Sequence, residues 1–342
     1  MPRRCRGHCR GPARRQPTKT RCRLGQEGEK RVAWPPPLAT RNNAGVSRMN
    51  HAEPVDSNGI GDESETRIPK RNISFGIGRQ PAPKWCDDNE VRTAFFDAFS
   101  LFLPEGERFF IRSVHAYADN VTDPRLREDI KAFSAQEAYH TREHEAYNRA
   151  IQDEGLPLAD VYGRIRKLLA TVKGKLECLS VTVGLEHLTA CLGYITLKYP
   201  EILADSDPRY RELWTWHALE EIEHKAVAFE VFQVASAKLP RWQAYFLRCG
   251  AMLTATHYIA RMQLELALEL LQVRGYATSW KTKVALLWVM LGTPGYYRRI
   301  IWYYLQFLKP NFFPAAGAES AYAQPWRDYF NERAMKPQDD HA

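Results

Sequence analysis

Two short stretches decide the fold and the chemistry of this chain. Residues 137–144 read Glu137-Ala138-Tyr139-His140-Thr141-Arg142-Glu143-His144, and residues 217–224 read His217-Ala218-Leu219-Glu220-Glu221-Ile222-Glu223-His224. Each stretch contains a Glu-x-x-His pair, and residues at that spacing share one face of a helix. Because a single pair of this kind is common on solvated helices, the surrounding pattern must decide whether the pairs are buried.

Both pairs lie in the middle of an otherwise apolar face. The first face comprises Leu126, Ile130, Phe133, Glu137, His140, His144, Tyr147 and Ile151, and the second comprises Tyr210, Trp214, His217, Glu221, His224, Ala228, Val231 and Ala235. Steps of three and four residues place each set on one side of an α-helix. Two further helical patterns carry a single glutamate at such a position, Glu107 within 96–114 and Glu186 within 176–197.

The glutamates and histidines follow a fixed order along the chain: Glu107, Glu137 with His140, Glu186, and Glu221 with His224. In four-helix bundles this is the ligand order of a carboxylate-bridged two-metal site. Four ionised glutamates in a core would be costly and would repel one another. Two divalent cations would neutralise them, so we expect a buried site for two metal ions, with charged surface helices as the alternative.

We expect an all-α fold built on a ferritin-like four-helix bundle over residues 73–240. Asp123-Pro124 and Asp207-Pro208 each supply a capping residue followed by proline at the first helical position,. A longer connection between Gly155 and Gly174 has room for a short helix and joins the two helix pairs. Ferritin-like topology requires such a crossover.

Three further side chains are candidates for the site. Glu220 lies four residues before His224 and could replace Glu221 as a ligand, although the apolar face favours Glu221. His144 and His217 lie one helical turn from the two Glu-x-x-His pairs. Each could be an additional ligand, a partner of a ligand or a proton relay, and a structural core histidine is the alternative. The sequence therefore leaves the catalytic residues unassigned.

The ligand set bears on the metal and on the reaction. Carboxylates with a few imidazoles suit iron or manganese, with zinc as a further option. We expect iron, and with it O2-activating oxidase or oxygenase chemistry on a small or apolar substrate. A two-metal hydrolase that generates a bound hydroxide is the first alternative, and non-enzymatic iron binding or storage is the second.

The ligand-bearing segments resemble those of a bacterial family described as predicted metal-dependent hydrolases. The similarity spans roughly residues 74–314 and is carried by residues 102–110, 136–144, 186–189 and 217–225, which include all six expected ligands. The resemblance implies a ferritin-like fold, bound metal and hydrolysis. The preference for oxygen chemistry rests instead on the ligands and on their mid-helix, aromatic surroundings.

The N-terminal segment differs in composition from the rest of the chain. The formal charge is +8, but residues 1–48 contain 13 Lys and Arg and two acidic residues, so residues 49–342 carry −3. We expect residues 1–72 to be a disordered basic and polar segment. Met49 is a second candidate start, which would make residues 1–48 a start-site artefact. The mildly acidic globular part is not expected to bind nucleic acid.

Helical patterns continue after the bundle, at 241–273, 279–291 and 296–308. Residues 241–315 should therefore pack on the bundle, followed by a polar tail over 316–342. The apolar runs at 286–291 and 300–305 are shorter than the ~20 residues of a membrane span, and association with a membrane surface is an alternative. Scattered cysteines and no apolar leader favour a cytoplasmic protein, and a homodimer is compatible with such a bundle.

Overall fold

The structure is a computed structural model that describes residues 68–79, 81–277, 279–314 and 319–336. The expectations for residues 1–67 lie outside this described part. Every regular element within it is helical, which confirms the all-α prediction. The ferritin-like relationship stays a prediction.

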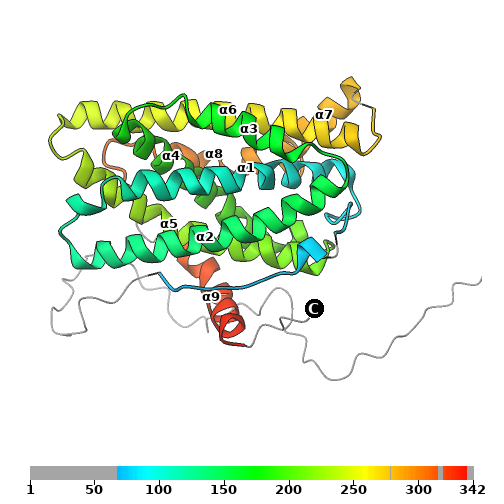
Figure 1. The fold of residues 1–342 in the computed structure, drawn as a ribbon, viewed down its shortest axis with the longest axis horizontal. Helices are drawn as coiled ribbons and strands as arrows, with labels where there is room; N and C mark the ends of the chain where they lie inside the picture. The colour runs from blue at the N-terminus through cyan, green and yellow to red at the C-terminus, as the bar shows by residue number, and fades with distance from the viewer. Residues whose placement is uncertain (1–67, 80, 278, 315–318, 337–342) are drawn as a thin grey trace, which may run out of the picture. The chain divides into compact units, whose positions relative to one another are not determined.

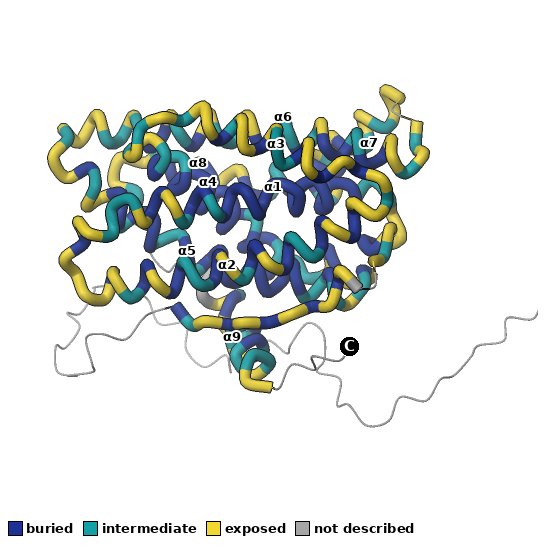
Figure 2. The backbone as a smooth tube through the Cα atoms, viewed as in Figure 1, coloured by how far each residue is buried: buried dark blue, intermediate teal, exposed yellow. Residues whose placement is uncertain are grey.

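Four long helices enclose the centre of the molecule: α1 (Glu90–His115), α2 (Pro124–Asp153), α4 (Lys175–Lys198) and α5 (Pro208–Ala235). α1 packs against α2 and α4 packs against α5, while α1–α4 and α2–α5 contacts join the two pairs (Figure 1). Their inward faces are buried along most of their length (Figure 2). Each of the four therefore presents one face to a shared interior, as in a four-helix bundle.

The predicted capping residues start two of these helices. The Asp123 side chain accepts a hydrogen bond from the backbone N–H of Arg125, and Asp207 accepts one from the backbone N–H of Arg209. Each cap satisfies an N–H that would otherwise lack a partner at the helix start. The caps define where α2 and α5 begin.

Two glycines of α4 allow neighbouring backbones to approach closely. A Cβ on Gly193 would lie 2.5 Å from the carbonyl oxygen of Ala218 in α5, and a Cβ on Gly184 would lie 2.7 Å from the Cα of Met252 in α6. No side chain fits at either distance, so both helix contacts require glycine. These contacts place α4 tightly between α5 and α6.

The remaining helices connect or cover the four. α3 (Leu158–Leu169) lies in the connection between the two pairs, and short 3-10 helices occupy Ile77–Arg79 (η1), Ala118–Asn120 (η2) and Pro200–Leu203 (η3). The three C-terminal patterns form α6 (Arg241–Val273), α7 (Trp280–Leu291) and α8 (Tyr296–Gln306). α6 packs on α1 and α4, α7 on α1, and α8 on α4.

Both ends of the described part differ from the sequence expectation. Residues 68–72, assigned to the disordered segment, contain the buried side chains of Ile68 and Arg71. Residues 319–335, assigned to a polar tail, form α9 (Glu319–Met335), which buries Trp326 and Phe330 and packs on α4 and α5. The tail prediction was wrong for this stretch because its apolar residues are few and Pro325 interrupts the helical pattern.

Among the described helices, α4 is long and apolar enough to cross a membrane by length and composition. However, 83% of its most apolar 18-residue stretch is buried inside the protein. α4 is therefore the central core helix of this arrangement, and its apolar surface is used by α1, α5, α6 and α8.

Candidate metal centre

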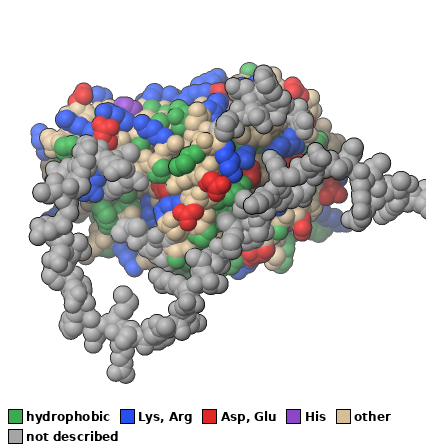
Figure 3. Space-filling model, turned by 90° about the horizontal axis from the view of Figure 1, so that it is seen from below, with side chains coloured by type: hydrophobic (Ala, Val, Ile, Leu, Met, Phe, Trp, Pro, Cys, Tyr) green, Lys and Arg blue, Asp and Glu red, His purple; other side chains and the backbone are tan. Residues whose placement is uncertain are grey.

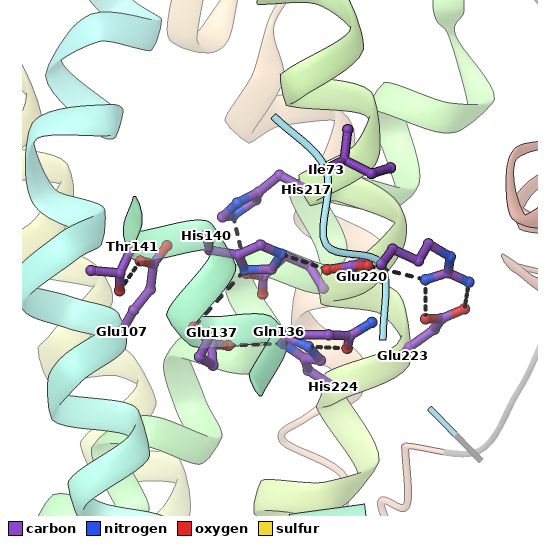
Figure 4. Close-up of polar contacts among 12 residues, drawn as sticks. Ile73, Glu107, Gln136, Glu137, His140, Thr141, His217, Glu220, Glu223 and His224 are labelled. Carbon is purple, nitrogen blue, oxygen red and sulfur yellow. Dashed lines mark hydrogen bonds and ion pairs between the residues drawn. The ribbon is translucent and has the colours of Figure 1, made fainter. Parts of the chain in front are cut away.

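Eight ionisable side chains from α1, α2, α4 and α5 converge between the helices. Seven of them form two buried groups that could each hold a metal ion, and within each group the ligand atoms lie within 4.8 Å of one another. The first group contains Glu137, His140, Glu221 and His224, and the second contains Glu107, His144 and His217. Glu186 adjoins the first group, with its Oε2 3.9 Å from His224 Nδ1. The structure thus brings together every ligand candidate except Glu220. Figure 4 shows five of them: Glu107, Glu137, His140, His217 and His224.

Many of the donor atoms in this cluster lack a hydrogen-bond partner within the described part of the chain. They are five carboxylate oxygens and three imidazole nitrogens: Glu107 Oε1, both oxygens of Glu137 and of Glu186, His140 Nδ1, His217 Nε2 and His224 Nδ1. Each unsatisfied buried polar group costs about 1–3 kcal/mol. Oxygen and imidazole donors of this kind are ligands for divalent metals, so the residues fit a bound metal.

The outer nitrogens of the two motif histidines are engaged, and each partner comes from the opposite half of the bundle. His140 Nε2 lies 3.0 Å from Glu220 Oε2, and His224 Nε2 lies 2.7 Å from Gln136 Oε1. Because these oxygens accept hydrogen bonds, each Nε2 carries the proton and each Nδ1 keeps its lone pair for the centre. Metal-binding histidines are commonly oriented in this way.

The structure separates Glu220 from Glu221. Glu220 faces away from the cluster, where Arg71 Nη1 lies 3.2 Å from its Oε1. Glu221 faces inward, with its Oε1 3.0 Å from His217 Nε2, while Thr189 donates a hydrogen bond to Oε2. The apolar face of the sequence pattern pointed to the same residue.

His144 and His217 lie side by side, but they differ in how many of their ring nitrogens are engaged by neighbouring side chains. His217 Nδ1 lies 3.3 Å from His144 Nε2, and its own Nε2 is among the unpartnered donors. Both nitrogens of His144 are engaged, since its Nδ1 lies 2.8 Å from Ser100 Oγ. His217 therefore has a nitrogen available for a metal, whereas His144 is placed to orient His217.

Burial sets the protonation of the cluster. Loss of solvation, reinforced by neighbouring carboxylates, raises the pKa well above the usual range for three carboxyl groups, those of Glu107, Glu137 and Glu186. Burial lowers the pKa of three imidazoles, those of His140, His144 and His224. Burial alone would raise the pKa of Glu221, but the adjacent His217 imidazole and the charge of His224 contribute to lowering it. Without cations, therefore, most of the carboxyl groups take up protons.

A small apolar cavity adjoins the centre at His217 and Glu221. Its volume is about 40 Å³, and its walls include five aromatic side chains: Phe95, Phe96, Phe99, Trp214 and Tyr296. Space of this size is close to that of one water molecule, ~30 Å³. In the sequence these residues could not be distinguished from core.

Sequence reasoning missed Gln136 and considered Glu220 only as an alternative ligand, not as a residue that holds a histidine. Gln136 and Glu220 each directly precede a motif glutamate, so their equivalent positions in the two halves could have indicated a shared role. Both are held in turn by the segment before α1: Gln136 Nε2 donates to the Pro69 carbonyl, and Arg71 donates to Glu220. No periodic pattern marks that segment.

A family model with the description "predicted metal-dependent hydrolase" matches residues 69–317, which include both donor groups. The chain belongs to this family. The family resemblance inferred from the motifs is thereby confirmed, and the family description together with the two buried donor groups suggests metal binding. No curated protein and no solved structure matches the chain.

Proposed function

We propose that this predicted metal-dependent hydrolase family member is a two-metal, iron-dependent enzyme that uses O2 to oxidise an apolar substrate. The observation that carries the proposal is the aromatic cavity directly against His217 and Glu221. A cavity walled by aromatic rings favours apolar groups and excludes water. A hydrolase, by contrast, has to admit water and a polar bond to its metals.

The donor groups suggest how two ions would be held. Glu137, His140 and His224, with Glu186 beside them, would hold one ion, and Glu107 with His217 would hold the other. Glu221 belongs to the first group and lies 3.0 Å from His217 of the second, so its carboxylate would be within reach of both ions. Bound iron would supply the redox chemistry that passes electrons from the oxidised substrate to O2.

The chain itself supplies positioning and proton transfer. The rings of Phe96, Phe99 and Trp214 orient an apolar group against His217. His144 connects His217 Nδ1 to Ser100, and the Ser100 hydroxyl donates to Asn148 Oδ1 at 2.8 Å. A proton can therefore pass between His217 and Ser100 through His144 without opening the cavity to solvent.

Hydrolysis is the second candidate, because the family description names it. Paired metals generate a bound hydroxide and polarise a substrate oxygen, and the same donor set could hold zinc or manganese. This candidate requires a polar substrate to reach the centre, and the cavity at His217 has few polar walls.

Metal analysis followed by exposure to O2 separates the candidates. We expect the purified protein to contain two iron ions per chain, and the reduced protein to consume O2 with a transient visible absorption band. Zinc without iron or manganese, or iron-loaded protein that hydrolyses esters but consumes no O2, would contradict the proposal. Large iron-filled particles would indicate storage instead.

A matched pair of α2 variants tests the ligands. Glu137→Gln keeps the size of a buried side chain whose two oxygens lack partners, whereas Glu145→Gln changes a side chain that pairs with Arg108 outside the cluster. We expect Glu137→Gln to lose metal and O2 consumption together, and Glu145→Gln to retain both. Equal metal content in the two variants would remove Glu137 from the ligand set.

A further inference from the structure

The outward faces of α7 and α8 expose large apolar side chains. They are Trp280, Val284, Leu287, Trp288 and Leu291 on α7, and Ile301, Trp302 and Leu305 on α8. Together they form what we call the α7–α8 apolar face, since the two helices pack against each other. Three tryptophans dominate it, with exposed fractions of 71%, 62% and 74% for Trp280, Trp288 and Trp302. Large exposed apolar patches of this kind mark sites of interaction.

The chain segment that carries this face has charged residues of a single sign. Between Glu269 and Glu319 the sequence contains no acidic residue, while six basic residues occur there: Arg274, Lys281, Lys283, Arg298, Arg299 and Lys309. Lys281 and Lys283 are exposed on α7 next to Trp280. By contrast, acidic, basic and apolar side chains are interspersed on the face seen from the opposite side (Figure 3).

We propose that the α7–α8 apolar face docks on the surface of a bilayer that contains anionic lipid. Tryptophan and leucine side chains flanked by lysine and arginine are the composition of helices that lie in the membrane interface. α7 has 12 residues and α8 has 11, too few to span a bilayer. The basic side chains complement anionic headgroups, and the apolar ones enter the boundary with the acyl chains.

A groove on this face is linked to the aromatic cavity by one pair of hydrogen-bonded side chains. Its volume is about 390 Å³, and it lies between α6, α7 and α8, lined by Leu291, Ile301 and Tyr297 among others. The Tyr297 hydroxyl donates a 2.6 Å hydrogen bond to Gln263, which lines the aromatic cavity beside His217. The Tyr297–Gln263 pair thus lies between the groove and the cavity.

The closeness of the groove to the aromatic cavity suggests the class of substrate, and this part of the inference rests on the proposed function. The substrate is a lipophilic molecule that partitions into the bilayer, enters the groove from the docked face and passes Tyr297 to reach the centre. The docking itself requires no metal, so it can be tested separately from the oxidation chemistry.

The test measures flotation of the full, metal-loaded chain with vesicles of phosphatidylcholine containing phosphatidylglycerol. One variant combines Trp280→Ser, Trp288→Ser and Trp302→Ser, and a second combines Lys281→Gln and Lys283→Gln. Met335→Ser is the control, because Met335 is 83% exposed and is the last residue of α9, a helix that packs on α4 and α5. The basic segment 1–48 is present in every protein, so only differences between variants count.

We expect the wild-type chain and Met335→Ser to float with anionic vesicles and the tryptophan variant to remain in solution. Each basic residue near an anionic surface contributes about fivefold in affinity, so the lysine variant should bind roughly 25-fold more weakly. Flotation of the tryptophan variant equal to that of wild type would overturn the proposal, as would no flotation of wild type. A wild-type dimer that the tryptophan variant converts to monomer, without vesicle binding, would assign the face to a second copy and also overturn it. Any of these results with normal metal content and O2 consumption would leave the proposed function standing.

Discussion

Replacing Arg71 tests whether the segment before α1 controls the metal centre. Arg71 is 1% exposed, and it pairs with Glu220, which is fully buried, and with Glu223 at 2.9 Å. Arg71→Met keeps much of the volume but leaves Glu220 without its cation. Removing one partner of a buried ion pair costs about 3–5 kcal/mol, and we expect about 3 kcal/mol because Arg327 still pairs with Glu223.

The same substitution should weaken metal binding through His140. Burial raises the pKa of Glu220 to about 8 even though Arg71 opposes the shift. Without Arg71 this pKa rises further, so the ionised form of Glu220 that accepts a hydrogen bond from His140 Nε2 becomes rarer. The protonated carboxyl group can instead donate to His140 Nε2, which would move the histidine proton to Nδ1, the nitrogen that faces the cluster. Loss of such a hydrogen-bond partner typically weakens metal affinity 10–100-fold.

Two measurements check this reasoning, with Arg327→Met as the matched control. Arg327 Nε donates to Glu223 at 2.9 Å, so the control removes a cation from the same ion-pair cluster but one that pairs with Glu223. Thermal unfolding of Arg71→Met should shift down by roughly 6–12 °C, and competition with a chelator should show weaker metal binding for this variant alone. Unchanged metal affinity in Arg71→Met, or equal loss in both variants, would refute the link from Arg71 to His140.

Two further predictions concern packing and pH. Gly193→Ala should lower the free energy of unfolding in chemical denaturation by about 1–3 kcal/mol, because its Cβ would lie 2.5 Å from the Ala218 carbonyl oxygen,. A Cβ at Gly163 would meet nothing within 4 Å, so Gly163→Ala should leave this free energy unchanged. Equal effects of the two substitutions would contradict the close α4–α5 contact. Burial raises the pKa values of the Glu107, Glu137 and Glu186 carboxyl groups. In protonated form these groups stabilise the metal-free fold below their unfolded pKa of about 4.3, and this contribution is lost as the pH rises through their folded pKa values. The difference in melting temperature between metal-loaded and metal-free protein should therefore widen from pH 5 to pH 8, and a constant difference would contradict burial of ionisable carboxyl groups.

The sequence was informative where a helix has one buried face. Periodicity located the four helices and placed Glu221 inward and Glu220 outward, because a shift of one residue turns a side chain about 100° around the helix. Arg71 and α9 gave no comparable signal. Arg71 lies in an extended segment whose burial depends on contacts with α5, and α9 buries few residues in a polar context. The cavity is lined by residues of five helices, α1, α4, α5, α6 and α8, so its position depends on how these helices pack, which no local sequence pattern encodes.

The two halves of the centre are equivalent at some positions and different at others. Gln136 and Glu220 occupy equivalent positions and hold the histidine of the opposite half. The positions equivalent to His144 and His217 are occupied by Ala228 and Phe133, so both additional histidines lie on the side of Glu107. The aromatic cavity also opens on that side, at His217. Two ions held here would therefore have unequal surroundings, and the one near Glu107 would face the substrate. A structural or storage site has no need of that asymmetry, whereas an enzyme that must bind substrate at one ion and hold the other in place does.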